Sequence, residues 1–147
     1  MRILLQFFPP LTFLFMALML GIAASAQSAD SPIRGPVMLV LDSAYSMSGQ
    51  IDGVAKTTMA GRAIGELVTE WSESQLGLAA YGHRREGDCS DIQTVAPLGP
   101  VVPGAFSGAV NGLIPRGKTP LAEAVRQAAG ALGYRDRRAG VVLVSDG

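Results

Sequence analysis

The sequence has no excess of charge of either sign, and it contains one histidine and one cysteine. Its 147 residues include twelve basic and twelve acidic side chains. This balance gives no basic surface for nucleic acid and no acidic tail, so neither class of partner is favoured. No internal repeat or low-complexity tract occurs. A chain of this length is expected to form one domain.

The N-terminal residues have the layout of a secretory signal peptide. Met1 and Arg2 precede an apolar stretch from Ile3 to about Ile22, and Ala24-Ser25-Ala26 offers a cleavage site of small residues. The alternative is an uncleaved membrane anchor, since the stretch approaches the length that spans a bilayer. We predict a signal peptide over residues 1–26, a linker over 27–36, and a periplasmic or extracellular protein.

The stretch VMLVLDSAYS, residues 37–46, predicts a buried strand followed by a polar loop. Five apolar residues run directly into Asp42, as in strands of parallel sheets that are covered on both faces. Three-and-four spacing of apolar residues predicts a helix over about 56–70, with Trp71 closing the core at its end. Further strands are expected at 76–81, 91–95 and 139–144, with a hairpin connection between the first two, and helices at 105–113 and 120–132. The segment 97–104 is expected to be loop.

This alternation predicts an α/β fold, with a doubly wound, mostly parallel sheet and helices on both faces. Two strands end in aspartate, at Asp42 and Asp146, and hydroxyl side chains follow the first. In open α/β sheets, ligands bind at the carboxyl ends of the strands. Carboxylate and hydroxyl oxygens, together with water, suit a hard cation such as Mg²⁺.

Three motifs together resemble a von Willebrand factor type A domain: VMLVLDSAYSMSGQ, RGKTPL and VVLVSDG. The resemblance covers residues 37–147. It implies a Rossmann-like fold with a metal-ion-dependent adhesion site formed by Asp42, Ser46, Thr119 and Asp146. It further implies Mg²⁺, or Mn²⁺ or Ca²⁺, whose coordination is completed by an acidic side chain of a protein partner. Domains of this family continue past the SDG motif, so we expect an incomplete domain whose strand 139–144 has an uncovered edge.

One position departs from the family pattern, because Ala44 stands where the motif has a hydroxyl residue. A methyl group cannot ligate a cation, and Ser43 is expected to face the opposite side of the strand. Tyr45 also adds bulk where small residues are usual. Two hypotheses follow: a weakened metal site in which water replaces the missing hydroxyl, or a metal-free structural or interaction module.

A nucleotide-binding interpretation competes for the same residues. Residues 112–119, GLIPRGKT, match the P-loop pattern GxxxxGK[ST]. That motif requires a buried strand before it and a helix that already contains the lysine and threonine. Here GAFSGAVN precedes it, and Pro120 disfavours a helical conformation at Thr119. The interpretation predicts ATP binding that is sensitive to Lys118→Ala.

No catalytic constellation emerges from the remaining residues. His83 has no serine or cysteine nucleophile in an activating context, and an acid–base role of Asp42 and Asp146 fits this fold less well than ligand binding. The chain is therefore predicted to be a recognition module and not an enzyme.

Two further groups of residues are open to a binding role. The loop residues His83, Arg84 and Arg85 are either solvated or contact an acidic partner, and Asp88 and Asp91 offer oxygens but no recognisable Ca²⁺ loop. Exported bacterial proteins that resemble this chain often carry a cysteine after the SDG motif, which implies that Cys89 has its disulfide partner outside the given sequence.

Overall fold

The computed structural model describes residues 35–147. The predicted signal peptide and residues 27–34 of the predicted linker lie outside the described residues. No helix within 35–147 has the length and apolar character needed to cross a membrane.

A four-stranded mixed sheet in the order β5-β4-β1-β6 forms the centre of the fold. Strand β1 (Val37–Asp42) pairs in parallel with β4 (Gln75–Tyr81) and β6 (Gly140–Val144), and β5 (Ile92–Pro100) pairs antiparallel with β4. The three parallel strands therefore end at the same edge of the sheet. We call this edge, with the loops that follow Asp42, Tyr81 and Val144, the rim.

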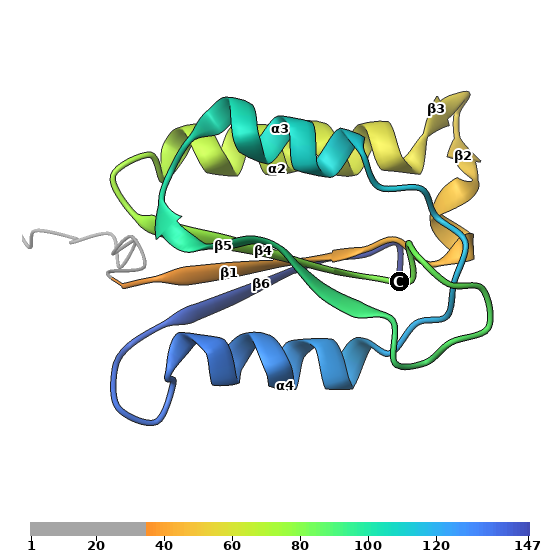
Figure 1. Cartoon of the computed structure of the whole chain (residues 1–147). Coiled ribbons are helices and arrows are strands. Elements are labelled where there is room, and N and C mark those ends of the chain that lie inside the picture. The colour runs from red at the N-terminus through yellow and green to blue at the C-terminus, as the bar shows by residue number, and fades with distance from the viewer. Residues whose placement is uncertain (1–34) are drawn as a thin grey trace, which may run out of the picture. The chain divides into compact units, whose positions relative to one another are not determined.

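Helices cover both faces of the sheet, as predicted. Helices α2 (Lys56–Glu70) and α3 (Pro103–Asn111) lie on one face, and α4 (Leu121–Leu132) lies on the other (Figure 1). Alternate residues of β1 enter the two cores: Leu39 and Leu41 join the cluster of α2 and α3, while Met38 and Val40 join that of α4. Every residue of β1 is buried, which confirms the prediction of a strand covered on both faces.

The long helices follow the apolar spacing of the sequence. Helix α2 has the predicted bounds and buries Ala60, Ile64 and Val68 at intervals of four residues, and Trp71 packs against the same core. Helix α4 begins at Leu121, directly after Pro120, and ends at Leu132. The next residue, Gly133, has a φ of 65°, the left-handed conformation typical of the position after a helix.

The expectation of a loop over 97–104 is wrong. Strand β5 continues to Pro100, and α3 begins at Pro103, so the loop is reduced to two residues. An edge strand tolerates Pro97 and Pro100 because only some of its N–H groups face a neighbouring strand. Proline also suits the first position of a helix, where its missing N–H has no partner to lose.

The segment between β1 and α2 contains elements that the sequence interpretation missed. A short 3-10 helix, η1 (Tyr45–Ser48), is followed by a hairpin of β2 (Gln50–Ile51) and β3 (Val54–Ala55). Asp52 and Gly53 connect the strands with φ angles of 50° and 80°, as a two-residue Asp-Gly turn requires. The hairpin lies at the rim (Figure 1), so helix α2 begins next to the loop that follows Asp42.

Candidate metal centre at the rim

Asp42 lies at the end of β1 and is only 2% exposed. Its Oδ1 accepts a hydrogen bond from the Ala44 amide at 2.8 Å, and its Oδ2 accepts one from the Ser145 hydroxyl at 2.9 Å. One oxygen is thus held by the loop that follows β1, and the other by the residue that follows β6. The carboxylate is fixed between two of the motifs found in the sequence.

Ser46 and Asp146 meet at the same place. Ser46 lies in η1, and its hydroxyl donates to Oδ1 of Asp146 at 3.2 Å. Asp146 also forms an ion pair with Lys56 through Oδ2, and the Lys56 ammonium donates to the Ser46 carbonyl at 3.2 Å. The hydrogen bond from Lys56, and after it that from Ser46, lowers the pKa of Asp146 below its usual 3.8. Asp146 is therefore a carboxylate at neutral pH.

Thr119 is exposed on the loop between α3 and α4. This loop is held against the rim because the Tyr45 amide donates to the Gly117 carbonyl at 3.1 Å, and Ala44 and Gly117 form an isolated parallel bridge. The Arg116 and Gly117 amides both donate to the Gly82 carbonyl, at 3.1 and 2.8 Å. Gly117, two residues before Thr119, thus lies beside Ala44 in the loop that follows Asp42.

Ala44 and Tyr81 form the apolar side of the rim. The methyl group of Ala44 is buried in the cluster that contains Val40 and Tyr81, on the side of α4. The Tyr81 phenol is fully buried, and within residues 35–147 its hydroxyl has no hydrogen-bond partner. Burial, and then the nearby Asp42 carboxylate, raises the pKa of Tyr81 above its usual value of 10. The phenol stays protonated, so a buried donor remains available to a water or another oxygen beside Asp42.

The carboxylate and hydroxyl oxygens at the rim are of the type that binds a hard cation, but there are few of them. Two carboxylates and two hydroxyls come from the loops after β1, α3 and β6. The described residues contain no group of three or more His, Cys, Asp or Glu side chains that could hold a metal ion. A cation bound by Asp42, Ser46, Thr119 and Asp146 would thus need waters or a partner's oxygen to complete its coordination.

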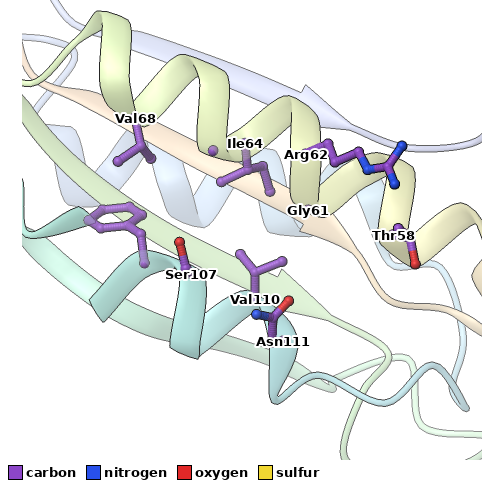
Figure 2. Close-up of a pocket in the computed structure, with 10 residues that line it drawn as sticks. Thr58, Gly61, Arg62, Ile64, Val68, Ser107, Val110 and Asn111 are labelled. Carbon is purple, nitrogen blue, oxygen red and sulfur yellow. The ribbon is translucent and has the colours of Figure 1, made fainter. Parts of the chain in front are cut away.

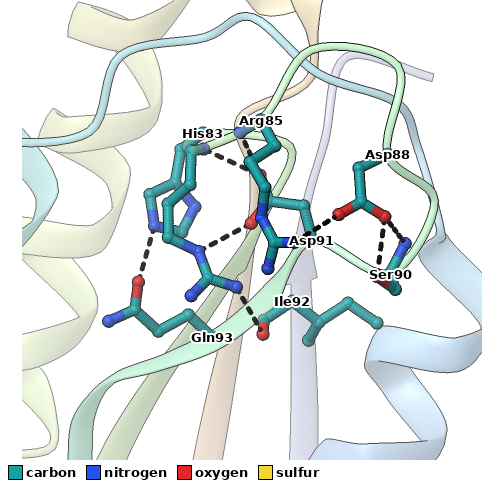
Figure 3. A network of polar contacts seen from close by, with 8 residues as sticks. His83, Arg85, Asp88, Ser90, Asp91, Ile92 and Gln93 are labelled. Atoms are coloured by element: carbon teal, nitrogen blue, oxygen red, sulfur yellow. Dashed lines mark hydrogen bonds and ion pairs between the residues drawn. The ribbon is translucent and has the colours of Figure 1, made fainter.

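The loop from Gly82 to Asp91 is closed by a polar network around Asp91 (Figure 3). Asp91 is fully buried and accepts hydrogen bonds from the Arg84 and Arg85 amides at 2.7 and 3.0 Å and from Nε of Arg84 at 2.7 Å. Burial raises the pKa of Asp91, but these donors together lower it below 3.8. The carboxylate is saturated by its own loop, which argues against a Ca²⁺ site here.

The other polar residues of this loop also contact one another. Arg85 pairs with Asp88 at 3.0 Å, and His83 lies 3.0 Å from the Gln93 side chain (Figure 3). Ser90 donates to Asp88 at 2.6 Å from its hydroxyl. Cys89 is exposed and carries a free thiol. These contacts hold the loop together, and they explain its polar side chains without a ligand.

The P-loop interpretation fails on the geometry of residues 112–119. The element before them is helix α3, and α4 begins only at Leu121, beyond both Lys118 and Thr119. A phosphate-binding loop needs a strand before it and a helix that starts within the motif. The sequence match is therefore coincidental.

A separate groove of about 280 Å³ lies between α2 and α3 (Figure 2). Gly61 of α2 lies opposite Val110 and Asn111, which would be 3.6 and 3.9 Å from a Cβ at that position, and a Cβ at Gly65 would meet nothing within 4 Å. Its lining contains no carboxylate, histidine or cysteine. The groove therefore lacks the groups for metal binding or acid–base chemistry, which gather at the rim instead.

The sequence predicts Asp42, Ser46, Thr119 and Asp146 as site residues, but it does not predict the contact of Lys56 with Asp146. In the sequence, Lys56 marks only the start of a predicted helix. The one available signal was the Asp52-Gly53 pair, which predicts a tight turn and hence a return of the chain toward the loop after Asp42.

Residues 37–147 match the sequence profile of the von Willebrand factor type A domain family. The uncharacterized protein YwmC of Bacillus subtilis (strain 168) is 26% identical over 137 residues, covering 85% of this chain and 60% of that protein. This chain thus spans about three fifths of the length of that curated relative.

Solved structures share the fold at low sequence identity. The vWF domain of the type V pili tip protein Mfa5 from Porphyromonas gingivalis has a TM-score of 0.60 at 18% identity, over 76% of this chain and 37% of that one. The PilB minor pilin from Streptococcus sanguinis has a TM-score of 0.58 at 13% identity, over 80% and 31%.

Proposed function

This chain belongs to the von Willebrand factor type A domain family, and on that premise we propose that it is a protein-binding module with its binding site at the rim. In this proposal Asp42, Ser46, Thr119 and Asp146 hold a divalent cation, Mg²⁺ or Mn²⁺. An acidic side chain of a protein partner completes the coordination. The module binds and does not catalyse.

The observation that carries the proposal is the convergence of oxygen donors from sequence-distant motifs. Asp42 and Ser145 are joined at 2.9 Å, and Ser46 and Asp146 at 3.2 Å, across about a hundred residues of sequence. The carboxyl edge of an open α/β sheet is where such proteins bind ligands. The signal peptide predicted for residues 1–26 supports an export route, and we place the module in the periplasm or outside the cell.

Thermal unfolding of the full chain tests the metal step. A ligand that binds only the folded state raises the melting temperature by mass action. We expect millimolar Mg²⁺ or Mn²⁺ to raise the melting temperature, EDTA to reverse the rise, and Asp42→Asn to abolish it. Asp136→Asn is the matched control, because Asp136 is exposed in the loop between α4 and β6, at the opposite edge of the sheet. A rise that persists in Asp42→Asn would contradict the assigned site.

A metal-free interaction module is the second candidate, and two observations favour it. Ala44 offers a buried methyl group where the family motif has a hydroxyl, and Asp146 is already neutralised by Lys56. A melting temperature that does not respond to Mg²⁺, Mn²⁺ or EDTA, with an intact folded baseline, would select this candidate.

A further inference from the structure

Lys56 places its ammonium group between two of the proposed metal ligands. The ammonium pairs with Oδ2 of Asp146 and donates to the carbonyl of Ser46 at 3.2 Å. The Ser46 hydroxyl binds the other oxygen of Asp146 at 3.2 Å. Both carboxylate oxygens of Asp146 thus have donors from the protein itself.

The hairpin β2–β3 fixes the position of this lysine. The Lys56 amide donates to the Gly49 carbonyl at 3.0 Å, closing the hairpin onto the end of η1. Gly49 has no side chain, and a Cβ there would lie 3.7 Å from Cε of Lys56, so the aliphatic stem passes over the glycine. The side chains of Lys56 and Asp146 are only 23% and 11% exposed. The pair is therefore better shielded from solvent than an ordinary surface ion pair.

Helix stability does not explain a lysine at this position. Lys56 is the first residue of α2, and no acidic residue lies in the first turn of that helix. A positive charge at a helix N-terminus is unfavourable, because the backbone dipole already makes that end positive. The compensating negative charge comes from Asp146, which is ninety residues away in the sequence. This points to a role at the rim.

We propose that Lys56 is a built-in competitor of the divalent cation at Asp146. It neutralises the carboxylate when no metal is bound, and a divalent cation must displace the ammonium to gain this ligand. The inference rests on the proposed function and deepens it: Lys56 sets the metal concentration at which the rim becomes competent to bind an acidic partner.

The surroundings of Lys56 allow such a displacement. The pair borders an open cavity of about 300 Å³ whose other walls are mainly apolar, formed by Met47, Ile51, Met59, Ala60, Ala63 and Val144. The lysine is not enclosed, so its flexible stem can turn along this cavity while the ammonium stays in water. The backbone of the rim does not have to move.

Calorimetric titration of the full chain with MgCl₂ and MnCl₂ tests the competition. Lys56→Gln should increase the association constant for Mg²⁺ about tenfold or more, because a positive charge next to the cation is removed. Lys56→Arg keeps the charge and should bind Mg²⁺ as the unmodified chain does.

Lys118→Gln is the matched control, since it removes one exposed positive charge from a neighbouring loop without touching Asp146. It should change the constant by less than about threefold. Equal effects of Lys56→Gln and Lys118→Gln would overturn the proposal.

A metal-free measurement completes the test. In EDTA, a double-mutant cycle of Lys56→Gln and Asp146→Asn on the free energy of unfolding should show coupling, and additive effects would overturn the proposal. If Lys56→Gln binds Mg²⁺ and the unmodified chain does not, the competition holds and the metal step of the proposed function fails. If both bind equally well, the competition fails and the proposed function stands. If neither binds, both fail.

Discussion

Ala44 is the residue at which this chain departs from the metal-binding motif of its family. The residue is only 2% exposed and belongs to the cluster of Val40 and Tyr81. The backbone of Ala44 still serves the site, because its amide donates to Oδ1 of Asp42 at 2.8 Å. The backbone contact with Asp42 is thus present, while the hydroxyl that the family motif has at this position is absent.

Ala44→Ser should change metal affinity and stability in opposite directions. The added hydroxyl supplies an oxygen ligand, so we expect Mg²⁺ to bind about tenfold more tightly in a calorimetric titration. Without metal, a hydroxyl in this apolar cluster should lower the free energy of unfolding by about 1 kcal/mol. Ser43→Ala removes a hydroxyl one residue earlier and should leave Mg²⁺ affinity unchanged. If Ala44→Ser bound Mg²⁺ no more tightly than the unmodified chain, the idea of a weakened site would be wrong.

The loops that follow β1, β4 and α3 meet at Gly82. Its φ is 73°, and a Cβ there would lie 2.6 Å from the Lys118 carbonyl and 2.9 Å from Cα of Ala44. Any side chain at this position would therefore push the loop of Thr119 away from Ala44.

Gly82→Ala should destabilise the fold through both its dihedral angle and this contact. We expect a loss of about 3 kcal/mol or more in the free energy of unfolding, measured with urea. Gly87→Ala separates the two causes, because Gly87 has a similar φ of 76° but nothing within 4 Å of a Cβ. It should cost only about 1 kcal/mol. Equal losses would show that the close approach at Gly82 does not matter.

At the scale of elements, the connection from β4 to β5 supports the rim through Asp91. The carboxylate binds the Arg84 and Arg85 amides, and the Gly82 amide donates to the Asp91 carbonyl at 3.0 Å. Gly82 in turn accepts hydrogen bonds from the loop that carries Thr119. Asp91 therefore acts on the candidate site through the loop.

Asp91→Asn should remove a pH-dependent part of the stability. The folded pKa of Asp91 lies below the ordinary 3.8, so its contribution is complete above about pH 5 and is lost as the pH falls through the folded value. We expect Asp91→Asn to be about 2 kcal/mol less stable in urea at pH 7, with the difference shrinking below pH 4. Asp52→Asn, in the exposed turn of the hairpin, is the control. A constant difference between pH 7 and pH 3 would contradict this role of the charge.

The elements that could be predicted from the sequence are those whose pattern is local. Buried β1 follows from five successive apolar residues, and α2 from the spacing of Ala60, Ile64 and Val68. Strand β5 extends beyond its predicted end. Proline disrupts a strand only where its missing N–H would have faced a neighbouring strand, and the pairing with β4 decides which positions those are.

The candidate site also contains residues that a local sequence pattern predicts and a contact that no such pattern predicts. Asp42 and Asp146 could be recognised because each follows an apolar strand. The contact of Lys56 with Asp146 joins residues ninety positions apart and exists only after the hairpin and β6 are both in place. No local sequence pattern predicts such a contact.

At the scale of the whole molecule, β6 is one of the two edge strands of the sheet within residues 35–147. Strand β6 is the last in the order β5-β4-β1-β6, and within residues 35–147 it pairs only with β1. Leu143 on this strand is 38% exposed. An unpaired strand edge that carries apolar side chains is a template for pairing with another chain.

A protein made of residues 1–147 should therefore self-associate through β6. We expect sedimentation velocity to show association that increases with protein concentration, and Leu143→Lys to reduce it, because charged side chains on edge strands oppose edge-to-edge pairing. Ile114→Lys is the matched control, since Ile114 is an apolar residue of the loop before α4 and is 60% exposed. It should leave the association unchanged. If Ile114→Lys reduced association as much as Leu143→Lys, general surface hydrophobicity and not the strand edge would be the cause.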